Sequence, residues 1–374
     1  MTIRHPIAKL VFDTLDTGRN NLRIRKKKCF KRHQVETVQS LKPVELSRIA
    51  QINKTTLNRI LQKEHAQLSV INNRIRGISP ELVEEILKEK HPHLYKSSII
   101  LTNTTTGGVG KTSATISLAY SARRITSRKT PIILIDADSQ SSLTTQLVKD
   151  VGEHALIDYF EGKVSIKDLV KPVGGTDNIY LIPSNLNNIY LDKALSKPSL
   201  IKSAMKKLFD DIFEHFKSEG SERAKIFVDF PPQLSSIFSS AVLGIAQYSN
   251  EVTKVLAIPL RADNFGVRGA EITISEVDEL LETFSIPKNA INITTFFSSL
   301  DRRVKTTADI FKMVMINQEL SKYLNPTAIR YSSELTKTSF RNETIYTRLE
   351  KSGVSDDYTD LLLSILGYQI EASE

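Results

Sequence analysis

The sequence is poor in cysteine and has no long apolar run. Its one cysteine, Cys29, cannot form an internal disulfide or a cysteine cluster, which excludes iron–sulfur and zinc sites built from the cysteines of one chain. No segment reaches the 18 apolar residues that a membrane-spanning helix needs. The first residues show no apolar stretch followed by a small-residue cleavage site, so we expect a cytoplasmic protein without a membrane partner.

The positive charge of the chain is concentrated at its start. Residues 1–98 contain 20 basic and 9 acidic side chains, whereas residues 99–374 contain 31 and 33, so the net charge of +9 arises in the first part. Residues 19–32 hold eight basic side chains and no acid. Such a segment attracts DNA, and a solvated tail is the alternative interpretation. The DNA contacts that we predict in it are Arg25, Lys26, Lys27 and Lys28.

Length and apolar periodicity divide the chain into three predicted parts. A single core rarely exceeds about 250 to 300 residues, so a chain of 374 residues predicts more than one domain. Residues 1–40 contain apolar residues at helical spacing and then the basic segment, which predicts an arm for dimerisation and DNA contact. Residues 41–97 read as short helices with no convincing strand, and residues 98–374 as an α/β domain.

The α/β part alternates short β-rich runs with helical segments. The runs begin at Ile99, Ile132, Ile179, Ile226, Lys254 and Ile291. This alternation predicts a mostly parallel sheet that is covered by helices on both faces.

Residues 44–62 fit a helix-turn-helix. The first helix would have an inner face of Leu46, Ile49 and Ala50. Thr55 would cap the second helix, and the inner face of that helix would consist of Leu57, Ile60 and Leu61. An ordinary helical hairpin is the alternative, and the adjacent basic segment favours DNA binding. The predicted contacts with base edges and phosphates are Lys54, Thr55, Thr56, Asn58, Arg59, Gln62 and Lys63.

Residues 104–113, TTTGGVGKTS, lie between an apolar run and an amphipathic helical segment, which is where phosphate-binding loops occur. The glycines would let backbone N–H groups close around phosphate oxygens. Lys111 would neutralise the β- and γ-phosphates, and the Thr112 hydroxyl would hold Mg²⁺. The predicted nucleotide-binding residues are Thr106, Gly107, Gly108, Val109, Gly110, Lys111, Thr112 and Ser113.

Two later strand ends carry carboxylates. Asp136 and Asp138 follow one apolar run, and Asp229 follows another. Asp136 and Asp138 face the same side while the chain is extended, so one can serve the metal and the other the attacking water. Asp229 lies where a hydrated Mg²⁺ would find a supporting carboxylate. Capping of a strand end is the alternative role for each aspartate taken alone.

The loop GGVGKT, together with the strings DADSQSSLT, VDFPP and LIPSNL, resembles the ParA/MinD family of deviant Walker ATPases. The resemblance runs from about residue 98 to the string AIRYSSELTKTSFRNETIYTRLEKS near the C-terminus. The pattern D-x-D-x-Q-x-x-x-T resembles the ParA branch. An arm and a helix-turn-helix ahead of the ATPase are similar to the large, type Ia plasmid partition proteins.

The resemblance implies an ATPase that binds ATP and Mg²⁺, forms a sandwich homodimer and binds nucleoid DNA until a ParB-like partner stimulates hydrolysis. With ADP or without nucleotide, it implies operator binding through the helix-turn-helix and repression of the protein's own operon. By this resemblance Lys111 contacts phosphate, Asp138 orients or activates the attacking water, Thr112 binds Mg²⁺, and Asp136 and Asp229 support the metal. Candidates for non-specific DNA contact near the C-terminus are Arg302, Arg303, Lys305, Arg330 and Arg341.

Thr106 departs from the family, which carries at this position a lysine that reaches across the dimer. A threonine donates one hydrogen bond and has no charge to offset phosphates. We therefore expect weak or partner-dependent hydrolysis, with Arg128, Lys129 or another basic group as a substitute.

Two functions of different classes remain open. The first is a DNA partition ATPase. The second is an ATP-responsive transcriptional repressor with little or no hydrolysis, which the missing lysine favours and the intact Asp138 and Asp229 oppose. A membrane-cycling regulator would need a basic amphipathic C-terminal helix, whereas the chain ends in LLLSILGYQIEASE with no nearby basic cluster.

Overall fold

The structure is a computed structural model that describes residues 38–64, 68–71, 74–301, 303–347 and 352–368. The chain divides into two compact units, Met1–Glu36 and Thr37–Glu374, and the second contains everything described below. Several predicted features lie outside the described residues: the helical arm and the residues Arg25, Lys26, Lys27, Lys28, Cys29 and Arg302.

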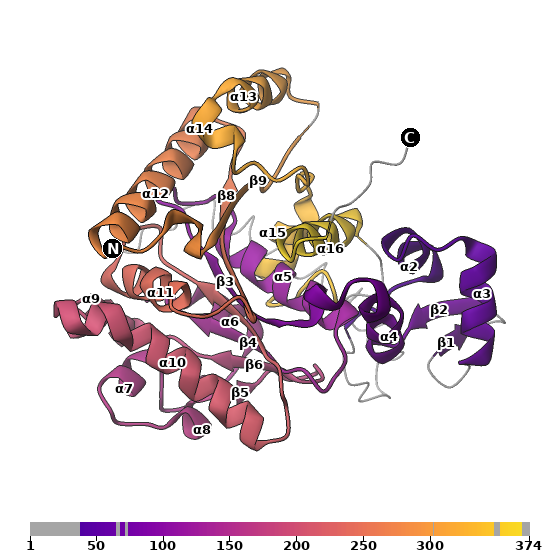
Figure 1. The fold of residues 1–374 in the computed structure, drawn as a ribbon, viewed down its shortest axis with the longest axis horizontal. Helices are drawn as coiled ribbons and strands as arrows, with labels where there is room; N and C mark the ends of the chain where they lie inside the picture. The colour runs from indigo at the N-terminus through magenta and orange to yellow at the C-terminus, as the bar shows by residue number, and fades with distance from the viewer. Residues whose placement is uncertain (1–37, 65–67, 72–73, 302, 348–351, 369–374) are drawn as a thin grey trace, which may run out of the picture. The chain divides into compact units, whose positions relative to one another are not determined.

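The second unit contains a seven-stranded sheet with the order β5–β6–β4–β7–β3–β8–β9 (Figure 1). Its strands are β3 (Ser97–Thr102), β4 (Ile132–Asp136), β5 (Lys171–Pro172), β6 (Ile179–Ile182), β7 (Lys225–Asp229), β8 (Val252–Leu260) and β9 (Asn292–Phe297). Only the short edge strand β5 runs antiparallel to its neighbour within this sheet. The prediction of a mostly parallel sheet is confirmed.

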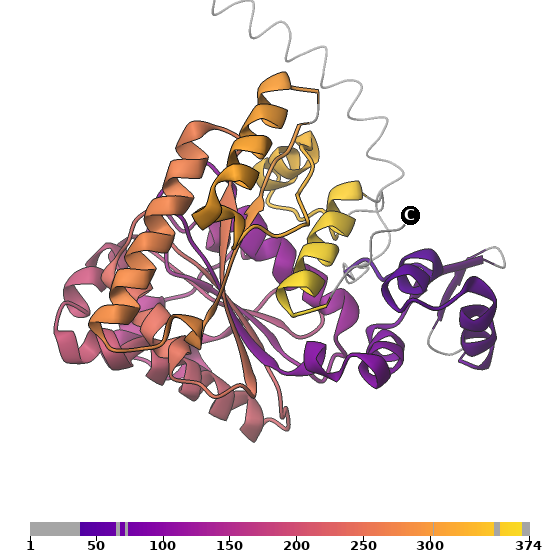
Figure 2. The ribbon, with the colours of Figure 1, turned by 45° about the horizontal axis from the view of Figure 1, so that its top comes forward.

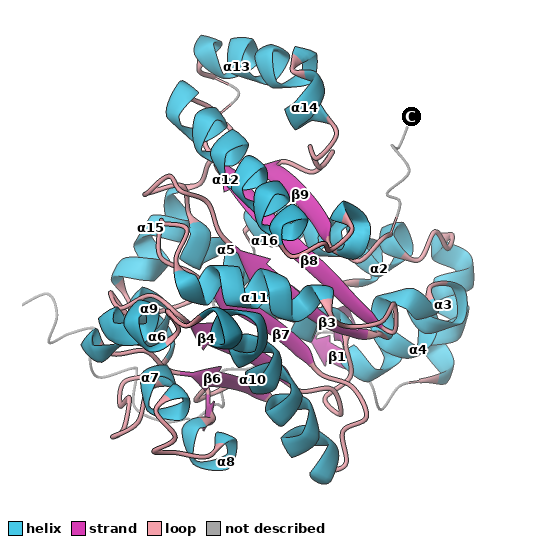
Figure 3. Ribbon diagram, turned by 60° about the vertical axis from the view of Figure 1, so that its left-hand side comes forward, coloured by secondary structure: helices cyan, strands magenta, loops and turns pink. Residues whose placement is uncertain are grey.

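Helices cover both faces of the sheet, as predicted (Figure 3). One face packs against α5 (Lys111–Ile125) and α16 (Gly353–Ile365), and its buried strand residues include Ile100, Leu134 and Phe227. The other face packs against α10 (Pro198–Ser218), α11 (Ser236–Ala246) and α12 (Asn264–Thr283). Because alternate strand residues point to opposite faces, strands that are covered on both faces are apolar along their length.

The remaining elements connect or flank this sheet (Figure 2). After β4 come α6 (Ser142–Leu147), α7 (Leu156–Phe160) and α8 (Ile166–Leu169), and after β6 come η3 (Leu186–Tyr190) and α9 (Leu191–Ala194). Further along the chain are η4 (Lys288–Ala290), α13 (Lys305–Ile316), α14 (Gln318–Ser321) and α15 (Ser333–Phe340). Among the described residues, no helix has both the length and the apolar character needed to cross a bilayer.

Residues 38–97 differ from the sequence expectation in two details. The first is a hairpin of two antiparallel strands, β1 (Leu68–Ile71) and β2 (Arg74–Ile78), so the expectation of no strand in this region was wrong. These strands are short and partly polar, which hides their period in the sequence. They follow α2 (Pro43–Ile49) and α3 (Lys54–Lys63), and precede α4 (Pro80–Lys90) and η2 (Pro92–Tyr95).

The second detail is the cap of α3. The side chain of Asn53 accepts a hydrogen bond from the Thr56 backbone N–H at 2.8 Å, so Asn53 and not Thr55 is the cap. Asn53 stands directly before the first helical residue, where a side-chain oxygen can accept from the first turn, whereas Thr55 is already inside the helix. Leu57 and Leu61 are buried and Ile60 is half-buried, whereas Asn58, Arg59 and the flanking polar residues of α3 face solvent or lie partly exposed.

The helix α2 packs on the α/β part, and α3 packs on α2. Their buried residues, such as Leu46 and Leu57, belong to the same apolar cluster as α5 and α16. Arg124, near the end of α5, is 1% exposed and pairs with Glu45 of α2 at 2.7 Å. The domain boundary at residues 97 and 98 stays a prediction.

Candidate nucleotide-binding site

Three neighbouring strands end at the predicted site. β7 lies between β4 and β3, and Asp229 at its carboxyl end is opposite Thr102 of β3 on one side and Asp136 of β4 on the other. The loop of residues 104–110 follows β3 directly and leads into α5. Because parallel strands end at the same edge, the loop and both carboxylates meet there, which is where α/β sheets bind ligands.

The loop has the backbone of a phosphate cradle. Gly108 and Gly110 adopt φ values of 69° and 85°, which favour glycine, and Gly110 is the residue that precedes α5. A Cβ atom added at Gly107, Gly108 or Gly110 would meet no atom within 4 Å, so this side of the loop faces open space. Val109 is buried and anchors the loop. The N-terminus of a 15-residue helix then faces any anion in the cradle.

Lys111 and Thr112 begin α5 and turn toward this edge. The Lys111 ammonium donates to the Thr106 carbonyl at 3.2 Å, and burial lowers the pKa of Lys111 although Asp229 and Asp138 oppose this change. The Thr112 hydroxyl donates to Asp229 at 2.6 Å. Ser113 is half-buried next to them. The structure therefore brings the predicted phosphate and Mg²⁺ residues together.

The carboxylates of Asp136 and Asp229 are buried side by side. Burial raises the pKa of Asp229 to about 8, with the carboxylate of Asp136 as the second cause. Burial also raises the pKa of Asp136 to about 7, against the opposing hydrogen bonds from Thr144. Two such groups are both charged near neutral pH only when a cation lies nearby, so their burial at a phosphate loop fits a metal-assisted site.

The residues fit a hydrated Mg²⁺. Among the described residues, no cluster of three or more His, Cys, Asp or Glu could hold a metal by itself. Mg²⁺ keeps several waters and binds through one or two protein oxygens and the phosphates of a nucleotide. Thr112 would supply the direct ligand, and Asp229, which accepts the Thr112 hydroxyl hydrogen, would orient it.

Asp138 lies at the mouth of the site and is half-buried. Its backbone N–H donates to Asp136 at 3.1 Å, and its carboxylate accepts from the Gln140 N–H at 2.9 Å. The Ser184 hydroxyl donates to the Asp138 carbonyl at 2.5 Å. These hydrogen bonds hold the loop that follows β4. The Asp138 carboxylate lies near enough to Lys111 to act on its pKa.

Sequence reasoning missed the residues that hold the aspartates. Thr144 donates to Asp136 through its backbone N–H at 2.8 Å and its hydroxyl at 2.7 Å, and also accepts from Ser184. Asn188 donates to the Asp136 carbonyl at 3.4 Å and to Ser184 at 2.8 Å. The threonine of the pattern D-x-D-x-Q-x-x-x-T is Thr144, so this pattern was the available signal for it. No local pattern indicated Asn188.

Thr106 is held against α12. Its hydroxyl donates to the Phe265 carbonyl at 3.0 Å, and a Cβ atom on Gly269 would lie 1.9 Å from the Thr106 hydroxyl oxygen. The preceding Thr105 hydroxyl donates to the Gly269 carbonyl at 3.2 Å. The Thr106 hydroxyl thus serves packing, and only glycine at 269 leaves room for it.

The suggested substitutes for the lysine lie elsewhere. Arg128 and Lys129 follow α5 and precede β4, at the amino edge of the sheet, whereas the phosphate loop lies at the carboxyl edge. Arg128 pairs there with Asp177 at 2.9 Å. Neither residue therefore lies where it could take the place of the lysine at position 106 within one chain.

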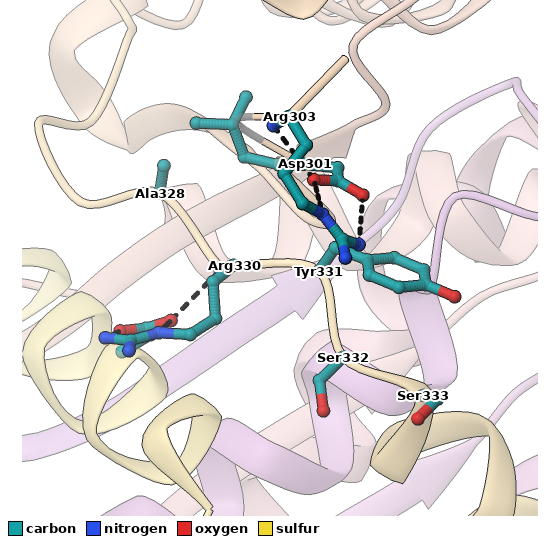
Figure 4. A pocket seen from close by; sticks show the side chains of 9 residues that line it. Asp301, Arg303, Ala328, Arg330, Tyr331, Ser332 and Ser333 are labelled. Carbon is teal, nitrogen blue, oxygen red and sulfur yellow. Dashed lines mark hydrogen bonds and ion pairs between the residues drawn. The ribbon is translucent and has the colours of Figure 1, made fainter.

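A cavity of about 590 Å³ opens beyond the carboxyl end of β9, at the same edge of the sheet (Figure 4). Arg303 makes a bidentate pair with Asp301 at 2.7 and 2.9 Å, and Arg330 makes one with Asp357 at 2.6 and 2.7 Å. Tyr331 is half-exposed beside them. These pairs compete with phosphate for Arg303 and Arg330. The DNA contacts of Arg303, Lys305, Arg330 and Arg341 stay predictions.

The family model described as AAA domain (AAA_31) matches residues 97–293, more than half of the chain. The chain belongs to this family. The matched residues contain the loop, the strand ends and the aspartates described above. No curated protein matches the sequence.

Three solved structures show the same fold. McdA from Cyanothece, in a complex of a variant with ATP, has 20% identity and a TM-score of 0.54 over 75% of this chain and 100% of that chain. A putative plasmid partition protein from Borrelia burgdorferi bound to AMPPNP has 18% identity and a TM-score of 0.51 over 72% and 98%. A cobyrinic acid a,c-diamide synthase from Mycobacterium smegmatis with ADP and magnesium has 17% identity and a TM-score of 0.52 over 71% and 94%. The predicted P-loop fold is confirmed.

Proposed function

We propose that the chain is a ParA-type DNA partition ATPase that binds ATP with Mg²⁺ at the loop of residues 106–113. The observation that carries this proposal is the meeting of Lys111, Thr112, Asp136 and Asp229 at the ends of three adjacent strands. In this site Lys111 balances phosphate charge, Thr112 binds the metal and Asp138 orients the attacking water. Mg²⁺ would supply electrostatic stabilisation of the transferring phosphoryl group.

The cavity beyond β9 supports the placement of the rest of the nucleotide. It lies at the same sheet edge as the loop, and its polar lining and the ring of Tyr331 suit a ribose and a base. In this arrangement the Arg303 and Arg330 pairs shape the cavity wall.

A homodimer that closes over the nucleotide is supported by apolar side chains around the site. Leu186, Ile189 and Tyr190 of η3 are 77%, 68% and 57% exposed, and Phe265 of α12 is 75% exposed. Both elements are joined to the site, η3 through Asn188 and α12 through Thr106. Exposed apolar groups that rim a polar site indicate a protein interface, and a twofold dimer would pair the same surface on each copy.

DNA binding through α3 is supported by its exposed polar face. Lys54, Thr55, Asn58, Arg59, Gln62 and Lys63 are exposed, and Thr56 is half-buried. Asn53 holds the start of the helix, and the apolar face of α3 is buried, so the polar face remains for DNA. In the proposed cycle the protein binds its operator through this face, associates with the nucleoid as an ATP dimer, and is released by a ParB-like partner.

A second candidate, an ATP-responsive repressor with little hydrolysis, is favoured by one observation. Thr106 has no charge, and its hydroxyl already donates to the Phe265 carbonyl, so residue 106 offers a phosphate neither a cation nor that hydrogen. The deciding experiment measures ATP turnover by the wild type and by Thr106→Lys, each with and without DNA and a ParB-like protein. Lys111→Ala, which removes the phosphate contact, sets the background.

We expect turnover by the wild type above the Lys111→Ala background when DNA and partner are present, and a higher basal rate for Thr106→Lys. A wild type that binds ATP yet never exceeds background would refute the partition ATPase and favour the repressor.

A further inference from the structure

The proposed site has fewer cations than its charges demand. Asp136, Asp138 and Asp229 are acidic, and Lys111 is the basic side chain that the loop itself brings to this edge. A bound triphosphate adds negative charge that one Mg²⁺ offsets only in part. Phosphoryl-transfer sites often obtain the missing positive charge from an arginine, supplied by the same chain or by a partner.

The helix α12 is the element that lies against the loop. Phe265 and Gly269 contact Thr106, so the first turns of this helix run beside residue 106. Phe265, Arg268, Gly269 and Ile272 follow the spacing i, i+3, i+4 and i+7, which places them on one stripe of the helix. Arg268 is therefore adjacent in the helix to the contact with Thr106, the residue that stands where the family has a lysine.

The surroundings of Arg268 indicate that this stripe is covered in the functional state. Arg268 is exposed, and its stripe neighbours Phe265 and Ile272 are 75% and 40% exposed. Aromatic and apolar side chains around an arginine are typical of the centre of a protein interface. The nearby Arg261 differs, because it is paired with Asp263, which caps α12.

We propose that Arg268 reaches the phosphates of the nucleotide bound by a second copy of the chain and supplies the positive charge that Thr106 lacks. Phe265, Arg268 and Ile272 are exposed, and docking of a second copy would remove water from Phe265 and Ile272. Removal of water strengthens the attraction between the guanidinium and the phosphates. This inference rests on the proposed function, because it requires an ATP-bound dimer.

The first test compares Arg268→Ala with the wild type in three measurements: binding of a fluorescent ADP analogue, ATP-dependent dimerisation by sedimentation, and ATP turnover with DNA. We expect ADP affinity within about twofold, because each monomer keeps its own loop, and turnover reduced at least about tenfold. Dimerisation with ATP should weaken in parallel. Arg128→Ala, an exposed arginine at the opposite sheet edge, should leave all three unchanged.

The second test distinguishes action across the dimer from action within one chain. Arg268→Ala and Asp138→Ala are each assayed alone and then mixed in equal amounts. In a mixed dimer, the nucleotide of the Arg268→Ala copy has its own Asp138 and receives Arg268 from the other copy, so we expect mixing to restore about a quarter of wild-type turnover. If mixing restores nothing, the action across the dimer is refuted.

Failure of this inference is separable from failure of the proposed function. A wild type that does not bind ATP overturns both. A wild type that hydrolyses ATP, with an Arg268→Ala variant that dimerises and hydrolyses equally well, overturns only the role of Arg268.

Discussion

Substitution of Glu45 tests how firmly α2 is attached to the ATPase part. The guanidinium of Arg124 is 1% exposed, and its shortest contact with a carboxylate is the 2.7 Å pair with Glu45. Glu45→Ala would leave a buried cation with the hydroxyl of Thr359, the carbonyl of Gln39 and the more distant Asp356, whose carboxylate is 3.9 Å away. Because the Arg124 side chain is buried, water does not replace the lost carboxylate.

The expected cost has two parts. Removing one partner of a buried pair costs about 3 to 5 kcal/mol, and the remaining acceptors of Arg124 place this case near the lower end. Glu45 also accepts the Lys42 N–H at 2.8 Å as part of the α2 cap, and loss of a cap costs roughly 1 kcal/mol. We expect the free energy of unfolding to fall by about 4 kcal/mol in total.

Urea unfolding followed by circular dichroism measures this change. Arg48→Ala is the matched control, because Arg48 also joins α2 to α16 by a 2.7 Å pair with Asp360 but is 45% exposed, and it should cost at most about 1 kcal/mol. A loss below about 1 kcal/mol for Glu45→Ala would refute the reasoning. An Arg124→Met, Glu45→Ala double variant that is more stable than Glu45→Ala would show that the unpaired charge is the cause.

Two further predictions concern a buried lysine and the DNA face. Burial lowers the pKa of Lys225 from 10.5 to about 7, so between these values the unfolded chain binds a proton that the folded chain lacks. The free energy of unfolding should rise with pH in this window by about 1.4 kcal/mol per unit more in the wild type than in Lys225→Met, measured by urea unfolding from pH 7 to 10. Asn58→Ala and Arg59→Ala should each weaken binding to the operator by about 1 to 3 kcal/mol and binding to random DNA much less, in fluorescence anisotropy. Equal losses of affinity for operator and random DNA would show that these residues contact the DNA backbone and not the base edges.

The central sheet was predictable because its strands are buried on both faces. Each strand that is buried in this way, such as β4, is therefore a continuous apolar run that the sequence shows directly. The glycines before Lys111 then indicated the phosphate-binding loop. The edge strand β5 has two residues, one of them proline, and carries no periodic signal. The hairpin strands β1 and β2 have four and five residues and are partly polar, so they also carry little periodic signal.

The site was predictable only where its residues follow strand ends. Asp136 and Asp229 do so, and the register brings them together. The contact of Thr106 with Phe265 joins residues 159 positions apart, and that of Asn188 with Asp136 joins residues 52 apart. Contacts of this kind leave no trace in the local pattern of one sequence, which is why the role of α12 beside the loop was missed.

The helix α5 connects the two halves of the proposed function. It begins with Lys111 and Thr112 at the nucleotide site and carries Arg124 at its other end, where it meets α2. In a repressor, operator affinity must respond to nucleotide, and coupling between two ligands is reciprocal. Glu45→Ala should therefore weaken the nucleotide dependence of operator binding in either candidate. Only a partition ATPase would also show DNA-stimulated turnover, which should persist in this variant because Asp138, Arg268 and the loop are untouched.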